Sequence, residues 1–122
     1  MTYTIKTNGQ TPYIFIVYKD DVAIDRATSQ YRANNLINTY TMFDSIPSNI
    51  KSNVFVAFKW AKNRLMRLEG EGHKIVLSRN KSTNKICCSF AKPEWPGDHC
   101  GKEMETGALA IVISVCEYEN GL

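Results

Sequence analysis

The stretch SNVFVAFKWAKNRLMRLE, residues 52–69, carries the clearest periodicity in the chain. Its apolar residues recur at intervals of four, three, four and three positions: Val54, Phe58, Ala61, Leu65 and Leu68. Such spacing places side chains on one face of a helix, and Gly70 and Gly72 then supply a stop signal. The stretch therefore predicts an amphipathic helix over residues 52–69.

Other elements are expected on both sides of this helix. A first helix should begin at Thr28 or Ser29 and end near Asp44, ahead of Pro47. Strands are expected at residues 3–7, 13–18, 22–24, 74–79, 85–90 and 108–117, the last as an apolar central strand. The order β-β-(β)-α-α-β-β-β predicts an α+β fold, in which two helices pack on one face of a mainly antiparallel sheet of about five or six strands.

Length and composition favour one compact domain over residues 1–122. Apolar residues make up 43% of the chain and charged residues 22%, which is ordinary globular usage. The N-terminus lacks the pattern of a secretory signal, and no apolar run approaches the roughly 20 residues that cross a bilayer. We therefore expect a cytoplasmic protein that makes no membrane contact and keeps all four cysteines reduced.

Charge is strongly segregated along the chain. Residues 59–85 carry eight bases against two acids, a balance of +6. Residues 94–119 carry six acids against Lys102 alone, a balance of −5. Blocks of opposite sign can steer a charged partner, or they can hold two parts of one fold together.

The basic block suggests a binding surface on the second helix. Opposite its apolar seam, a helical wheel groups bases with an asparagine and a tryptophan: Lys59, Trp60, Lys62, Asn63, Arg64 and Arg67. Charge can attract an acidic protein surface or nucleic acid, while an aromatic ring offers an anchor. Trp95 lies between two prolines and could act as a second anchor, and the bases of the following hairpin could extend the surface: Arg79, Lys81 and Lys85. The structural alternative is that these bases form only the solvated side of an amphipathic helix.

Catalytic and metal sites have weaker support. His99, Cys100, Cys87 and Cys88 are zinc-ligand types, but no C-x-x-C pair is present, and adjacent strand cysteines point to opposite faces. His99 beside Cys100 could serve a thiol enzyme, and Asp20, Asp21 and Asp25 could bind a catalytic metal. Aspartate at a tight turn has a complete local explanation, however, and no cofactor motif is present.

These observations predict a small intracellular protein that binds another macromolecule without catalysis, with a protein as the expected partner. Short chains without motifs are common among phage and mobile-element accessory or inhibitor proteins, which is an association rather than a derivation. The first alternative is a nucleic-acid-binding protein that uses the basic helix and hairpin. The second is a small metal-dependent or thiol enzyme. The oligomeric state stays open.

Overall fold

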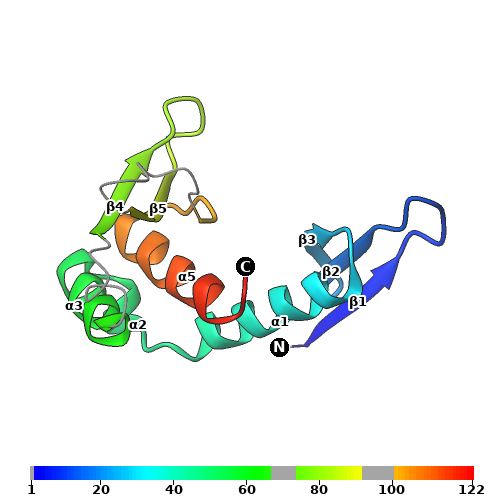
Figure 1. Ribbon diagram of the computed structural model, residues 1–122, viewed down its shortest axis with the longest axis horizontal. Helices are drawn as coiled ribbons and strands as arrows, with labels where there is room; N and C mark the ends of the chain where they lie inside the picture. Colours follow the sequence, from blue (N-terminus) through cyan, green and yellow to red (C-terminus); the bar gives the residue numbers. More distant parts are fainter. Residues whose placement is uncertain (1, 67–73, 92–100) are drawn as a thin grey trace.

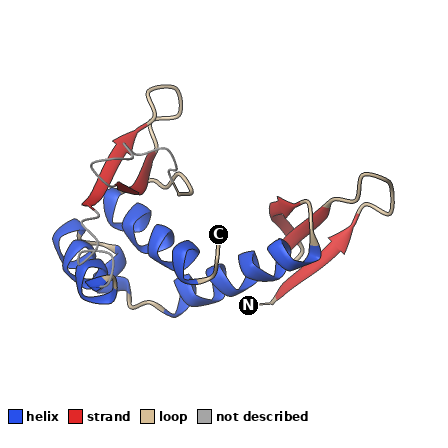
Figure 2. Ribbon diagram, viewed as in Figure 1, coloured by secondary structure: helices blue, strands red, loops and turns tan. Residues whose placement is uncertain are grey.

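The computed structural model describes residues 2–66, 74–91 and 101–122, and it has an α+β fold (Figures 1 and 2). Its strands are β1 (Tyr3–Thr7), β2 (Phe15–Lys19), β3 (Val22–Ala27), β4 (Lys74–Arg79) and β5 (Ile86–Ala91). Its helices are α1 (Gln30–Ser45), α2 (Ser48–Lys51), α3 (Val54–Arg64) and α5 (Gly107–Glu119). Figure 1 shows β1–β3 at one end of the long axis, with α2, α3 and the β4–β5 hairpin toward the other.

The N-terminal strands form an antiparallel sheet in the order β1-β2-β3. Asp20 and Asp21 make the turn between β2 and β3 with φ values of 49° and 69°, a left-handed conformation that aspartate tolerates better than most residues. The register pairs Ile5 with Val17, and both side chains contribute to the apolar cluster between the sheet and α1. The strands predicted from residues 3–7, 13–18 and 22–24 are confirmed, with β3 extended to Ala27.

Helix α1 begins where the sequence predicted. Ser29 is its N-cap, and its hydroxyl accepts a hydrogen bond from the backbone N–H of Arg32 (3.1 Å). The first half of the helix buries Ala33 and Leu36 against the N-terminal sheet. Near its other end, Met42 and Phe43 pack on a second and larger cluster around α5. One helix therefore joins the two apolar clusters.

Helix α3 confirms the predicted second helix over residues 54–64. Asn53 caps it, because its side-chain oxygen accepts hydrogen bonds from the N–H groups of Phe55 (2.9 Å) and Val56 (3.2 Å). The inner face consists of Ala57 and Ala61, which are fully buried and whose small side chains let α3 pack closely on α5. The helix is shorter than the predicted 52–69, because it ends at Arg64 with Leu65 as its C-cap, and residues 67–69 lie outside the described residues.

The expected final strand at residues 108–117 is wrong, because this segment is helix α5. Thr106 caps the helix by accepting a hydrogen bond from the N–H of Leu109 (3.2 Å). A helix that is covered on every side needs apolar residues all round, so it has no polar face to reveal its period. Helices α1, α2 and α3 and strands β4 and β5 all contact α5. It consequently buries Ala108 and the continuous run Ala110, Ile111, Val112, Ile113, Ser114, Val115 and Cys116.

The single sheet of five or six strands with two helices on one face is also wrong, since the described residues form two sheets and four helices. The described strands form one three-stranded sheet and, separately, the two-stranded antiparallel pair β4–β5. Since the final apolar segment is helical, it supplies no strand to extend β4–β5. Beyond its pairing with β4, β5 forms an isolated bridge between Ile86 and Met104, and the Cys88 carbonyl oxygen accepts a hydrogen bond from the backbone N–H of Gly101 (2.9 Å). Within the described residues, no helix has both the length and the apolar character that crossing a bilayer requires.

We expect Ile111→Ala to lower the free energy of unfolding by about 2–5 kcal/mol, because it leaves a cavity at a fully buried position of α5. Urea denaturation followed by circular dichroism measures this loss. Phe55→Ala is the control, since Phe55 is 83% exposed and its truncation should change stability by no more than about 0.5 kcal/mol. Equal stability of the two variants would contradict the central position of α5.

Candidate functional site

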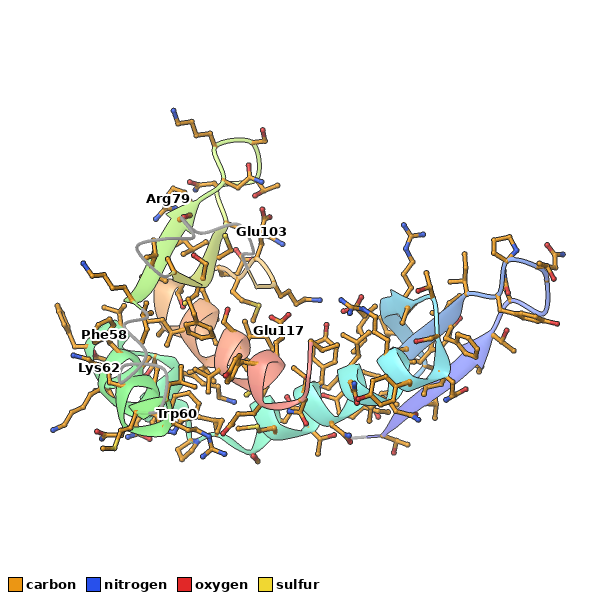
Figure 3. The ribbon with its side chains drawn as sticks, viewed as in Figure 1. Phe58, Trp60, Lys62, Arg79, Glu103 and Glu117 are labelled. Atoms are coloured by element: carbon orange, nitrogen blue, oxygen red, sulfur yellow. The ribbon has the colours of Figure 1, made fainter. Side chains whose placement is uncertain are left out.

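The side of α3 that faces away from α5 carries large exposed side chains. Phe55, Phe58, Lys59 and Lys62 all lie on this side, and we call these four residues the α3 outer stripe. At roughly 100° per residue they fall within an arc of about 100° on the helix surface. Phe55 and Lys59 lie far round from the buried Ala57 and Ala61, whereas Phe58 lies at the margin, about 60° from Ala61. Figure 3 shows Phe58 and Lys62 on this outer side. The stripe therefore combines two exposed aromatic rings with two ammonium groups.

The charged residues of α3 itself are all bases. Helix α3 contains no carboxylate between Val54 and Arg64. The Lys62 ammonium lies 5.4 Å from the centroid of the Phe58 ring, in a cation–π contact. Among the described residues, Lys59 has no ion-pair partner. Asn63 is exposed beside the stripe and adds polar hydrogen-bonding groups.

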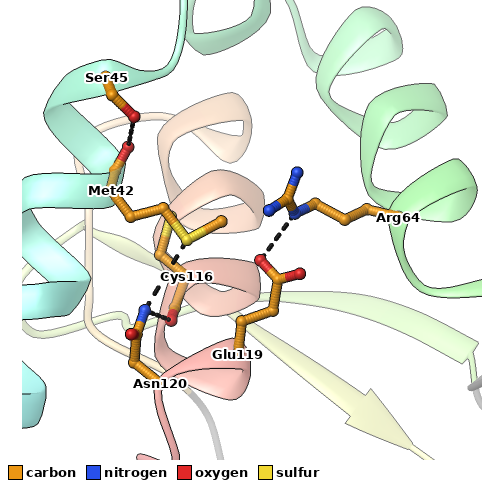
Figure 4. Close-up of polar contacts among 6 residues, drawn as sticks. All are labelled: Met42, Ser45, Arg64, Cys116, Glu119 and Asn120. Carbon is orange, nitrogen blue, oxygen red and sulfur yellow. Dashed lines mark hydrogen bonds and ion pairs between the residues drawn. The ribbon is translucent and has the colours of Figure 1, made fainter.

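Trp60 and Arg64 occupy a different side of α3 from the stripe. Trp60 is partly buried and packs against the cluster around α5. The Arg64 guanidinium lies 5.7 Å from the Trp60 ring centroid, and its Nε donates a hydrogen bond to Glu119 Oε2 at 2.6 Å (Figure 4). These two residues, which the sequence placed on the binding surface, therefore tie α3 to α5.

The C-terminal end of α5 is also fastened to α1. Figure 4 shows Asn120 donating from Nδ2 to the Cys116 carbonyl oxygen (2.8 Å) and to the Met42 sulfur (3.7 Å). The first contact caps the C-terminal end of α5, and the second links α5 to α1. Together with the Arg64–Glu119 pair, these contacts fix the orientation of α5 relative to α1 and α3.

The hairpin bases are held largely by contacts within the molecule. Arg79 donates from Nη1 to the Asn84 backbone and side-chain oxygens (3.2 and 3.0 Å). Lys85 forms an ion pair with Glu105 at 3.5 Å. Glu103 accepts hydrogen bonds from Asn80 (2.7 Å) and Thr83 (3.0 Å), the two hairpin residues that flank the exposed Lys81 and Ser82. Acids of the C-terminal block thus bind the basic block within one chain.

Some expected site residues cannot be placed. Arg67, Trp95, His99 and Cys100 lie outside the described residues. Within the described ranges, no three His, Cys, Asp or Glu side chains come together as a metal site. The expectation of four reduced cysteines is wrong, because Cys87 is disulfide-bonded.

The two free thiols are poor nucleophiles. Cys88 and Cys116 are both buried. Burial raises the pKa of each thiol to about 12, because the charged thiolate is poorly solvated there. Near neutral pH both groups are therefore protonated and shielded from substrates.

The three candidate aspartates are not brought together as a site. The Asp20 side chain accepts a hydrogen bond from the backbone N–H of Thr2 (3.0 Å), and Asp21 is exposed at the same turn. Asp25 instead faces α1, where it accepts a hydrogen bond from the Tyr40 hydroxyl (2.6 Å) and pairs with Lys102 (3.5 Å). Carboxylates that are engaged in this way have structural roles.

A polar cluster around Tyr40 was not expected from the sequence. Its hydroxyl donates to Asp25 and accepts a hydrogen bond from the Lys102 ammonium (2.6 Å). Burial first, and then the hydrogen bond to Asp25, raise the pKa of Tyr40 above its ordinary value. The adjoining pocket has a volume of about 30 Å³, which is room for roughly one or two water molecules. This cluster connects β3 and α1 to the C-terminal segment and is too small for an organic substrate.

Phe55 is the surface residue that sequence reasoning missed. The predicted apolar seam ran through Val54, Phe58, Ala61 and Leu65. The structure buries Ala61 and Leu65 as expected, together with Ala57, but it leaves Val54 and Phe58 at the exposed margin. The alanines could have revealed this, because small residues one turn apart mark a closely packed helix face. Comparison of the chain with protein-family models, with curated proteins and with solved structures finds no match.

We expect Cys116 to react slowly with iodoacetamide at pH 8 in the folded protein, because its thiol is buried and protonated. Mass spectrometry of the tryptic peptide 103–122 measures the modification, since Cys116 is the only cysteine in that peptide. The same protein in urea should react fully within the same time. Equal modification rates in the folded and unfolded protein would contradict the burial of this thiol.

Proposed function

We propose that the protein binds another protein, without catalysis, through the α3 outer stripe, and that the contacted surface of the partner is acidic. The observation that carries the proposal is the exposure of Phe55, which is 83% accessible on a helix without carboxylates. Aromatic side chains contribute strongly to protein interfaces when a partner removes them from water. A second aromatic ring and two lysines lie within the same arc of the helix.

The charge of the stripe supports an acidic partner. A partner that covers Lys59 must supply a carboxylate or leave the ammonium exposed at the rim, because burying an unpaired charge is unfavourable. The cation–π contact of Lys62 with Phe58 already brings charge and aromatic surface into one place. Opposite charge on the partner would increase the association rate as well as the selectivity.

Nucleic acid has less support than a protein partner. That alternative required the bases of the hairpin and of α3 to form one continuous cationic surface. Lys85 pairs with Glu105, Arg64 pairs with Glu119, and Glu103 binds two residues of the hairpin loop. These carboxylates reduce the field that phosphates would meet, and phosphate contacts supply most of nonspecific affinity for nucleic acid.

A pull-down with variants tests the proposed function. The immobilised full-length chain is exposed to a lysate of the cells that produce it, and retained proteins are quantified by mass spectrometry. For the specific partner, Phe55→Ser and Lys59→Glu should each reduce retention by about tenfold, because both change the α3 outer stripe. Thermal midpoints should stay unchanged, since both side chains are exposed.

Matched substitutions elsewhere serve as controls. Tyr31→Ser removes an aromatic ring that is 75% exposed on α1, and Lys6→Glu reverses an exposed charge on β1. Both controls should retain the partner as the parent chain does. Retention that is insensitive to the α3 substitutions, or equally sensitive to all four, would overturn the proposal.

A further inference from the structure

The surroundings of the α3 outer stripe indicate what kind of partner element it fits, an inference that rests on the proposed function. Phe55, Lys59 and Lys62 are separated by four and three residues, so they follow one line along the helix axis for about 10 Å. Phe58 lies beside this line, about 60° around the helix from Phe55. Two turns of a single straight helix therefore present the whole stripe.

Next to the stripe, Val54 of α3 and Leu77 of β4 extend the apolar surface toward β4, and we call these two residues the apolar shoulder. A Cβ atom placed on Gly107 would lie 3.2 Å from Leu77 Cδ1 and 3.3 Å from Val54 Cγ2, so these side chains of β4 and α3 approach each other over the glycine. Val54, Phe58 and Leu77 are each between 37% and 41% exposed. The first two are one helical turn apart on α3. The apolar surface thus extends along the Phe58 side of the stripe, while Lys59 lies on its other side.

This arrangement has one apolar edge and one cationic edge, both parallel to α3. A partner helix that lies along α3 presents side chains at intervals of three and four residues, which matches the spacing of Phe55, Phe58 and Lys62. Its apolar face would cover the two phenylalanines and the shoulder, and carboxylates one turn apart along its margin would reach Lys59. Helix recognition through anchors at such intervals is a recurring mode of protein binding.

We propose that the element bound by the α3 outer stripe is an acidic amphipathic helix. Its apolar side chains contact Phe55 and Phe58, and its carboxylates lie against Lys59, which has no ion-pair partner among the described residues. The charge of α3 favours such a partner, because the helix carries lysines and an arginine but no carboxylate between Val54 and Arg64.

A lipid surface fits the stripe less well. A helix that inserts into a membrane interface keeps its lysines on the flanks of the apolar face, where they can extend to the headgroups. Here Lys62 lies between Phe58 and Phe55 around the helix, within the aromatic face, so insertion of the two rings would draw its ammonium group toward the hydrocarbon. A carboxylate-bearing protein helix satisfies the same charges directly.

Selection from a random peptide library tests the partner chemistry. The library is selected against the full-length chain, and binders to the Phe55→Ser variant are removed. We expect enriched peptides to carry net negative charge, with leucine, isoleucine or phenylalanine at intervals of three and four residues. Synthetic copies should gain helical circular dichroism on binding and should bind Lys59→Glu about tenfold more weakly. Replacing one glutamate of the peptide by lysine should restore binding to Lys59→Glu, because the charges are then exchanged.

Several outcomes would overturn this inference. Enriched peptides of neutral or positive charge would do so, as would acidic peptides that bind the parent and Lys59→Glu chains equally. Binding to phosphatidylserine vesicles, or to a 20-base-pair DNA duplex, that is stronger than binding to the peptides and is lost in Phe55→Ser would assign the stripe to lipid or nucleic acid. If the pull-down depends on α3 but the selected peptides are not acidic helices, the proposed function stands and this inference fails. If neither measurement depends on α3, both fail.

Discussion

Burial of α5 is the constraint on which the remaining structure depends. Its apolar residues can leave water only if other elements surround them, and α1, α2, α3, β4 and β5 each contribute to that covering. The two-stranded pair β4–β5 gains from this arrangement, because an isolated hairpin is marginally stable in water. Likewise, α3 is oriented by its alanine face on α5, and that orientation determines which of its side chains remain exposed. The exposed stripe is thus a consequence of how the central helix is enclosed.

The segregated charges act mainly within the molecule. Arg64 and Glu119 are 55 residues apart in sequence but in direct contact, and Lys85 reaches Glu105 in the same way. Exposed pairs of this kind contribute modestly to stability, typically about 0.2–1 kcal/mol each. Their larger effect is on specificity: they favour the packing of α3 and the hairpin against the C-terminal acids over arrangements that would place like charges together. On the outer side of α3, Lys59 has no ion-pair partner among the described residues.

Local features could be predicted from the sequence where one segment determines its own conformation. Ser29 caps α1 as expected, and the β-rich segments around Ile5 and Val76 form strands. The final helix could not be recognised, because a fully enclosed helix and a central strand are both continuous apolar runs. Once that segment was assigned as a strand, a single large sheet followed from it. The error in the sheet and the error in α5 therefore have one physical origin.

The candidate site was predictable only in part for a related reason. Periodicity identified α3 and its exposed lysines, but it could not show that Trp60 and Arg64 turn toward α5. That distinction depends on the direction from which the neighbouring helix approaches, which is a tertiary property. The alanines of α3 carried the missing information, since they mark the closest helix contact.

The division of α1 between two apolar clusters bears on how the chain responds to stress. Its first half is held by Val17 and Ala27 of the N-terminal sheet, whereas Met42 and Phe43 belong to the larger cluster around α5. The smaller cluster contains four buried residues among those that the structure describes, against eleven in the larger cluster. Regions with few buried contacts open at lower free energy than the rest of a protein. Amide protons of β1–β3 should therefore exchange with solvent through partial opening, while the helices around α5 keep their protection until the whole chain unfolds.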